Sequence, residues 1–210
     1  MARKENRIMA NQFYTETAHI DRLRVDFDTV YTSVFLVRTE IGAILVDCAT
    51  TKEDVDTCIV PALGALGCLP TDLKAIVLTH NHGDHAGGLP RILELAPDIE
   101  VITDIRNITD SVSTYPLPGH TQDCIGVLDA RTSTLISGDG LQGAGVDKYR
   151  CYLQNQEAYL KTLDRVASDA AIANILFSHA YEPWNKDTAS DRNEVDACIR
   201  ACRLYAGASV

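Results

Sequence analysis

Three histidines and one aspartate fall within six consecutive positions of the segment LTHNHGDHAGG, which spans residues 78–88. They are His80, His82, Asp84 and His85. Side chains of these types are almost never buried without partners, so core packing does not explain their crowding. Imidazole and carboxylate groups are instead the ligands by which proteins bind zinc and similar divalent metals. The segment therefore predicts a metal site.

The spacing within this segment suits two metal ions rather than one. His80 and His82 are two positions apart, so in extended backbone their rings point the same way and can share a metal. Asp84 and His85 follow Gly83, where the chain can turn, and can face a second point nearby.

Further ligand-type side chains follow other predicted strands, and α/β architectures place their sites at the carboxyl ends of strands. These residues are His120, Asp139 and His179. Taken singly, each has a simpler explanation as a turn, a cap or a hydrogen-bonded core residue. Their convergence with residues 78–88 favours a site in which Asp139 bridges two metals. We expect His80, His82 and His120 on one metal and Asp84, His85 and His179 on the other.

Two metals about 3.5–4 Å apart can hold one hydroxide between them and stabilise a developing oxyanion. Asp84 is then the candidate catalytic residue, because it binds the second metal and can orient the hydroxide. Ligand histidines usually donate their other N–H to an outer partner, and Thr79 or Thr121 is expected in that role. His19 belongs to no cluster and is expected to be structural or at the surface.

The elements that must position these residues can be predicted from hydrophobic patterning. Residues 31–38 and 43–48 predict a hairpin, followed by a helix with Thr51 as its N-cap. The full predicted order is hairpin, helix, strand, helix, strand, strand, hairpin, helix, strand, helix. This order indicates one α/β layered domain over residues 1–210, with residues 1–17 as a candidate flexible N-terminus.

Composition narrows the class of protein. The chain has 210 residues, of which 46% are hydrophobic and 23% charged, as in globular domains. Its net charge of -10 disfavours a nucleic-acid partner. No apolar run reaches the roughly 18 residues of a membrane span, and the N-terminus lacks a signal-peptide core. We therefore expect a cytoplasmic protein without a membrane partner.

The seven cysteines are odd in number and form no CxxC pair, which favours reduced thiols. Cys198 and Cys202 are spaced as neighbours on a helix. They are expected to share a buried helix face, with a metal or redox pair as the alternative.

Four segments together resemble the metallo-β-lactamase superfamily, over about residues 30–183. They are THNHGDHAGG, PLPGHT, SGDGL and FSHAYEP, which match the family's ligand-bearing segments in order. The resemblance implies a four-layer αββα sandwich with its site at the carboxyl-terminal rim of the strands. It also implies the same seven metal ligands that the spacing predicts.

Within this superfamily, Asp139 makes the chain similar to the glyoxalase II, lactonase and phosphodiesterase branches. True β-lactamases usually lack this aspartate, and redox-active diiron members carry an acid where this chain has His82. The loop GLQGAGVDKYR resembles glyoxalase II, which implies that Lys148 and Tyr149 contact the substrate. Tyr181 is a further candidate substrate-binding residue.

The predicted function is a dinuclear metal-dependent hydrolase in which a metal-bridged hydroxide attacks the thioester, ester or lactone carbonyl of a small molecule. The alternative is a phosphodiesterase acting on a nucleotide-type substrate, and a β-lactamase or a diiron redox protein is less favoured. A non-catalytic metal-binding module is the alternative from another class. The expected cofactors are two divalent ions, with zinc favoured over iron or manganese.

Overall fold

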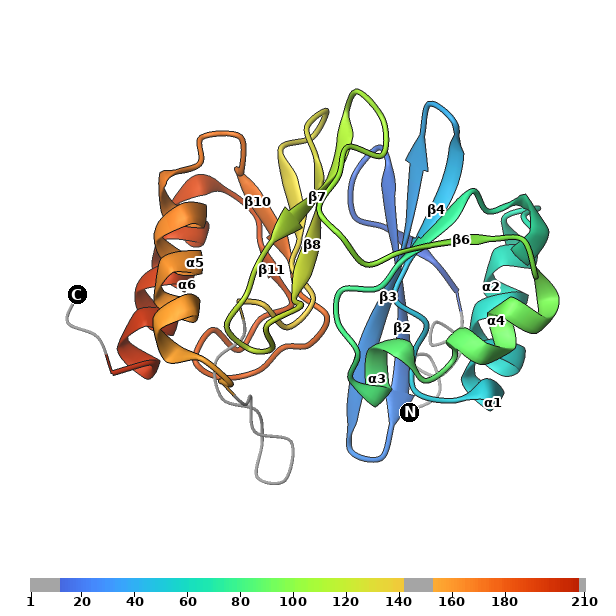
Figure 1. Ribbon diagram of the computed structural model, residues 1–210, viewed down its shortest axis with the longest axis horizontal. Helices are drawn as coiled ribbons and strands as arrows, with labels where there is room; N and C mark the ends of the chain where they lie inside the picture. The colour runs from blue at the N-terminus through green and yellow to red at the C-terminus, as the bar shows by residue number, and fades with distance from the viewer. Residues whose placement is uncertain (1–11, 142–152, 208–210) are drawn as a thin grey trace, which may run out of the picture. The chain divides into compact units, whose positions relative to one another are not determined.

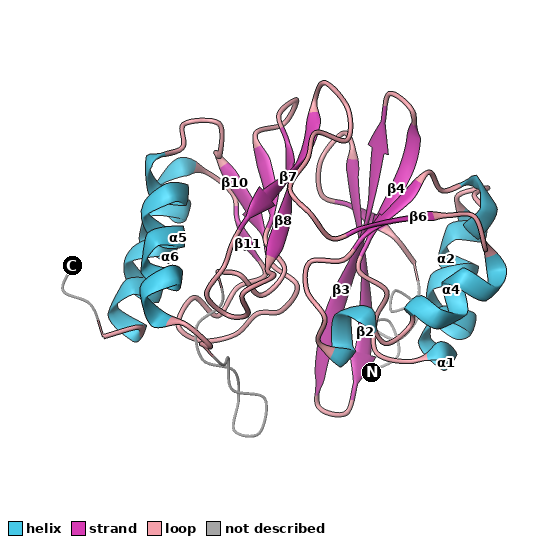
Figure 2. Cartoon of the chain, viewed as in Figure 1, coloured by secondary structure: helices cyan, strands magenta, loops and turns pink. Residues whose placement is uncertain are grey.

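The computed structural model describes residues 12–141 and 153–207 of the chain. The chain divides into two compact units, Met1–Ile102 and Thr103–Val210. Each unit combines one mixed β-sheet with helices packed against it (Figures 1 and 2).

The sheet of the first unit has six strands, in the order β1-β2-β3-β4-β5-β6. Antiparallel pairing connects β1 through β4, and parallel pairing connects β4, β5 and β6. The strands are β1 (Tyr14–Thr15), β2 (Ile20–Phe27), β3 (Val30–Thr39), β4 (Gly42–Val46), β5 (Ala75–Val77) and β6 (Glu100–Ile102). The predicted hairpin is confirmed as β3 and β4, whereas β2 was not predicted.

The parallel pair of β4 and β5 determines where the chemistry of the first unit lies. Val46 is in register with Val77, so both strands end at the same edge of the sheet. Their side chains are β-branched or otherwise apolar and fully buried toward that end, as expected for strands covered on both faces. The residues that follow the two strands therefore emerge side by side.

One helical segment of the first unit follows β4 directly. It consists of α1 (Lys52–Asp54), a π-helical turn η1 (Val55–Ile59) and α2 (Val60–Ala65). The predicted N-cap is confirmed, because the Thr51 hydroxyl accepts a hydrogen bond from the Asp54 amide and the Asp54 carboxylate accepts one from the Thr51 amide. The unit also contains η2 (Pro70–Asp72), α3 (Gly83–Ala86) and α4 (Leu89–Leu95).

The sheet of the second unit has five strands, in the order β11-β10-β9-β8-β7. The strands are β7 (Val112–Pro116), β8 (Ile125–Asp129), β9 (Thr134–Ile136), β10 (Asn174–Leu176) and β11 (Thr188–Ala189). Antiparallel pairs connect β7 to β8 and β8 to β9, while β9 and β10 are parallel. Consequently β7, β9 and β10 all run in one direction and end at the same edge.

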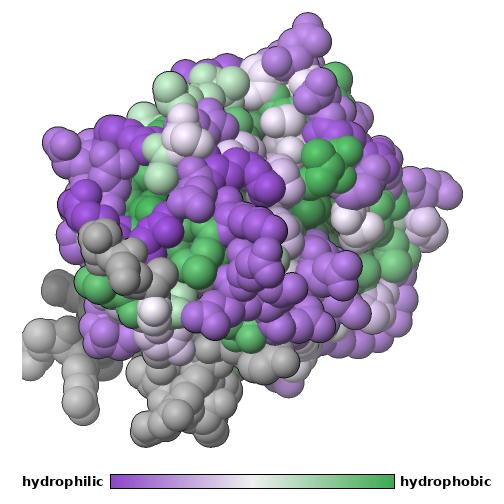
Figure 3. Space-filling view, turned by 60° about the vertical axis from the view of Figure 1, so that its left-hand side comes forward, coloured by the Kyte–Doolittle hydropathy of each residue, from purple (hydrophilic) through white to green (hydrophobic). Residues whose placement is uncertain are grey.

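Two amphipathic helices pack on this second sheet, α5 (Gln156–Ser168) and α6 (Arg192–Tyr205) (Figure 1). Each begins at a capping side chain, since Asn155 accepts from the Ala158 amide and Asp191 from the Glu194 amide. Their apolar faces form the core of this unit, while polar side chains predominate on the surface in Figure 3. Among the described residues, no helix has the length and apolar character that crossing a bilayer requires.

Candidate functional site

The first unit positions four ligand-type side chains just beyond the carboxyl end of β5. His80 and His82 precede α3, and that short helix carries Asp84 and His85. The ring centroid of His80 lies 4.5 Å from that of His82 and 4.3 Å from that of His85. His85 Nε2 is 3.6 Å from an Asp84 carboxylate oxygen. The structure therefore brings the whole predicted segment together.

Burial of this cluster is graded. His80 and His85 are 2% and 0% exposed, whereas His82 and Asp84 are partly exposed. Imidazoles that are buried need partners for both ring nitrogens. The cluster is therefore buried at His80 and His85 and reaches the surface at His82 and Asp84.

Asp47, which directly follows β4, is the residue that orients this cluster. Its Oδ2 lies 2.7 Å from Nδ1 of His85 and accepts the Thr79 hydroxyl at 2.9 Å, while its Oδ1 accepts the Thr79 amide at 2.8 Å. The carboxylate is completely buried, and Asp47 adopts a left-handed backbone with φ 65°. A buried carboxylate with three donors is held rigidly in one orientation.

These hydrogen bonds determine which ring nitrogen each histidine presents. Because Nδ1 of His85 donates to Asp47, its lone pair is on Nε2. The Thr79 hydroxyl gives its proton to Asp47 and therefore accepts from Nδ1 of His80, 3.2 Å away. Both histidines thus present Nε2 as a metal-type donor, as metal-ligating histidines do. Of the two threonines expected as outer partners, Thr79 has this role.

The other threonine, Thr121, has a different contact. Its hydroxyl lies 3.1 Å from the sulfur of Cys124, and both belong to the loop that follows β7.

Asp47 was not predicted as a site residue, although it stands directly after a buried apolar run at a strand end.

The second unit positions three ligand-type side chains at one sheet edge. His120 lies in the loop after β7, Asp139 in the turn after β9, and His179 three residues after the end of β10. All three are at least nine-tenths buried. Because the three strands run in the same direction, their carboxyl ends bring these residues together.

The Asp139 carboxylate divides its two oxygens between the two histidines of this unit. Oδ2 is 3.7 Å from Nε2 of His120, and Oδ1 is 3.4 Å from Nε2 of His179. These separations exceed those of ordinary hydrogen bonds. They approach the spacing of about 3.3 Å expected between two ligand atoms of a tetrahedral metal with bonds of about 2.0 Å. The donor set therefore fits a carboxylate that shares one metal with each histidine.

Close backbone packing supports the His120 loop. Gly119 has φ 148°, and a Cβ atom at this position would lie 2.5 Å from the Cα of Tyr159 in α5. Only glycine permits this approach. The loop is held further by the Gln154 amide, which donates to the carbonyl of His120 at 3.1 Å.

The three predicted substrate-binding residues divide between described and undescribed parts of the chain. The Tyr181 ring stacks on the imidazole of His179, with centroids 4.7 Å apart and planes 3° from parallel. Lys148 and Tyr149 lie outside the described residues. His19, expected outside any cluster, belongs to neither group of metal-type ligands among the described residues.

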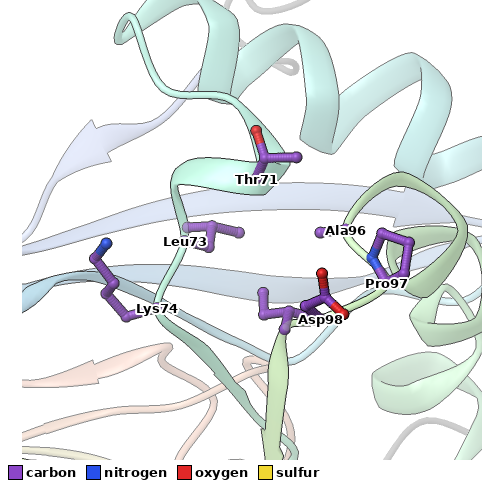
Figure 4. Close-up of a pocket in the computed structure, with 7 residues that line it drawn as sticks. Thr71, Leu73, Lys74, Ala96, Pro97 and Asp98 are labelled. Carbon is purple, nitrogen blue, oxygen red and sulfur yellow. The ribbon is translucent and has the colours of Figure 1, made fainter.

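A pocket of about 220 Å³ in the first unit is lined by residues that include Leu73, Lys74 and Asp98 (Figure 4). Leu73 and Lys74 directly precede β5, and Asp98 lies shortly before β6. The pocket is therefore at the amino-terminal edge of these strands, opposite the edge that carries His80. It contains none of the ligand-type side chains and is no part of the candidate site.

Comparisons with known proteins agree with this fold. The family model described as the metallo-beta-lactamase superfamily matches residues 27–104. A hydroxyacylglutathione hydrolase of Vibrio parahaemolyticus is 26% identical over 172 residues, which make up 69% of this chain and 66% of that protein. A hydroxyacylglutathione hydrolase of Pseudomonas syringae pv. syringae is 31% identical over 163 residues, which make up 64% of this chain and 63% of that protein. The chain thus spans just under two thirds of the length of these relatives.

Solved structures show the same fold at lower identity. A metallo-β-lactamase from Pseudomonas aeruginosa, in its mono-zinc form, matches with a TM-score of 0.69 and 16% identity, over 93% of this chain and 96% of that chain. Two mixed sheets with flanking helices, carrying His and Asp clusters at strand ends, define the metallo-β-lactamase fold here. The chain is therefore similar to the metallo-β-lactamase superfamily over residues 27–104 and has the fold of the solved metallo-β-lactamases.

Proposed function

We propose that this chain is a metal-dependent hydrolase that binds two divalent ions through the seven ligands predicted from the sequence. The observation that carries the proposal is the division of the Asp139 oxygens between His120 and His179. A carboxylate arranged in this way suits a bridge between two ions better than a ligand to one. The hydrolase names of the relatives and the similarity of residues 27–104 to the metallo-β-lactamase superfamily support the same proposal.

The ligands of either unit alone would leave a dinuclear centre incomplete. A catalytic zinc takes about three protein ligands and keeps a position for water or substrate. Two ions with about three ligands each, together with one carboxylate that both share, therefore require about seven residues. The first unit supplies four of these. We propose that His120 completes the ion bound by His80 and His82, and that His179 completes the ion bound by Asp84 and His85.

When bound, two such ions lower the pKa of a water molecule toward neutrality and polarise a substrate carbonyl. The chain's own residues prepare this chemistry. Asp47 and Thr79 hold the imidazoles of His80 and His85 with Nε2 presented, so the ligands need no reorganisation. The partly exposed Asp84 carboxylate can bind an ion and accept a proton from the attacking water.

We propose that the substrate is a small-molecule thioester, with esters and lactones as related candidates. The stacking of Tyr181 on His179 holds the phenol beside a ligand, where it can donate a hydrogen bond to a substrate or a leaving group. Lys148 and Tyr149 are proposed as further substrate contacts on the basis of the sequence. Zinc is the proposed metal, because imidazole and carboxylate donors suit it.

A substrate panel tests this proposal. The zinc-loaded chain is assayed with an S-acyl glutathione thioester, an acyl homoserine-type lactone and bis(p-nitrophenyl) phosphate, beside His82→Ala and the matched control His19→Ala. We expect the thioester to be hydrolysed fastest, with the activity lost in H82A and kept in H19A. A preference for the phosphodiester would favour the alternative phosphodiesterase. A fully metallated chain inactive on all three substrates would refute the proposed activity.

A further inference from the structure

The helix α6 places a buried thiol against the segment that carries Asp139. The Sγ atom of Cys202 lies 3.1 Å from the carbonyl oxygen of Leu141, two residues after Asp139. Cys202 and Leu141 are both 0% exposed. At this separation the thiol proton lies between sulfur and oxygen, so Cys202 donates and Leu141 accepts. No solvent competes for this hydrogen bond.

The start of the Asp139 turn is fixed independently. The Ser137 amide donates to the carbonyl of Leu176 at 3.0 Å, and the Gly140 amide donates to the carbonyl of Ser137 at 3.0 Å. A Cβ atom at Gly140 would lie 2.5 Å from the Cβ of Leu117, so the backbone is also pressed against that side chain. The bond from Cys202 adds a hydrogen bond at the far end of the turn, where the Leu141 side chain is also packed in the core.

The position of this turn matters because Asp139 has to serve two partners at once. Its oxygens lie 3.7 Å from His120 and 3.4 Å from His179, so a small rotation toward one histidine moves the carboxylate away from the other. A backbone hydrogen bond two residues away restricts such a rotation. Partners that hydrogen-bond directly to a ligand typically change metal affinity by about 10- to 100-fold when they are removed, so an indirect support is expected at the low end of this range.

We infer that Cys202 is a positioning residue for the Asp139 ligand, acting through the carbonyl of Leu141. It gives the α6 thiol a role beyond filling the core. Because Asp139 is a ligand only in the proposed function, the inference rests on that function.

Cys198 provides a matched control within the same helix. It lies one turn earlier, is 0% exposed, and its sulfur is 3.9 Å from that of Cys202. Among the described residues, the Cys198 thiol has a hydrogen-bond contact with the Cys202 thiol alone, so this side chain makes no hydrogen bond to the Asp139 turn. Truncating either cysteine to alanine removes the same volume from the same core, but only Cys202→Ala removes the donor to Leu141.

The experiment measures Co²⁺ binding by competition with a chromophoric chelator, together with the visible Co²⁺ spectrum, for wild type, C202A, C202S and C198A. We expect C202A to bind the weaker ion about tenfold less tightly, at the low end of the range for outer supports, with an altered spectrum. C198A should stay within about twofold of wild type. C202S should recover most of the loss, because its hydroxyl can donate to the same carbonyl.

Equal losses in C202A and C198A would overturn the inference, because both would then report only lost packing. A C202S variant as weak as C202A would also overturn it. If C202A does not fold, the volume-matched pair C202V and C198V carries the same comparison. A wild-type chain that binds no Co²⁺ would refute the proposed metal centre and this inference together. Two bound ions with indistinguishable cysteine variants would refute the inference alone.

Discussion

Oδ2 of Asp47 lies 2.7 Å from Nδ1 of His85, and both side chains are buried. The two residues are 38 positions apart in the chain, and the parallel pairing of β4 with β5 brings them to one sheet edge. This contact places the imidazole proton on Nδ1 and presents Nε2 to a metal. Asp47 is therefore the residue that links the strand register to the chemistry of the candidate site.

Replacing Asp47 with asparagine should weaken metal binding. An amide can accept the Thr79 amide but cannot accept both the His85 ring and the Thr79 hydroxyl as the carboxylate does. We expect the affinity of D47N for zinc to fall by about 10- to 100-fold, measured by chelator competition.

Asp129 supplies a matched control for D47N. It is also fully buried at a strand end, but its carboxylate accepts hydrogen bonds from Arg131 and Thr132 in the turn between β8 and β9. D129N should lower thermal stability without lowering metal affinity. Equal metal affinities in D47N and wild type would show that Asp47 has only a structural role.

Replacing His82 with alanine should cost the chain about one of its two metal ions, because the first ion would keep too few protein ligands. His82 is partly exposed, so truncation should leave stability close to that of wild type. Elemental analysis of purified H82A and H19A measures the difference. Full metal content in H82A would contradict the ligand assignment.

Replacing Asp139 with asparagine should make the chain bind one of the two ions more weakly than the other. An amide has one acceptor oxygen in place of the carboxylate's two, so it cannot bridge two cations equally. We expect one ion to stay bound and the other to dissociate at micromolar chelator, observed as two steps in a Co²⁺ titration. A single step of unchanged affinity would argue against a bridging role.

Stability should fall in alkaline solution because of a buried thiol. Burial raises the pKa of Cys124 from its ordinary 9.0 to about 12, although its hydrogen bond with Thr121 opposes the shift. The folded chain therefore keeps a proton that the unfolded chain releases above pH 9, and the free energy of unfolding decreases as pH rises from 9 toward 12. Between pH 8.5 and 10.5 the decrease from this thiol is about 2 kcal/mol.

The variant Cys124→Ser isolates this contribution, because a serine hydroxyl does not titrate in this range. Urea unfolding of wild type and C124S at pH 8.5 and 10.5 gives the difference. A difference that does not change with pH would show that the thiol ionises equally in both states. Cys48, whose pKa burial also raises, contributes with the same sign to both proteins and cancels.

Sequence patterning predicted the elements whose periodicity is local and strong. The β3–β4 hairpin and the helices α5 and α6 follow from their apolar spacing, and these elements are confirmed. The strand β2 was missed, although Leu23 and Val25 alternate with the exposed Arg24 and Asp26. Its charged face weakened the pattern, and its partner strand supplies the stabilisation.

The candidate ligands could be predicted because they are chemically unusual, whereas their support could not. HNHGDH has no packing explanation, and the structure brings its four ligand-type residues together. Asp47 follows a strand as many turn or capping aspartates do, and only the register of Val46 with Val77 places it beside His85. The hydrogen bond from Cys202 to Leu141 likewise depends on packing between residues that are 61 positions apart in the chain.

Metal content per chain tests the central claim most directly. The protein is purified without chelator or added metal, and its metals are measured by mass spectrometry, before and after incubation with zinc and desalting. We predict about two equivalents of zinc per chain after loading. A chain that keeps no divalent metal after loading would contradict the account.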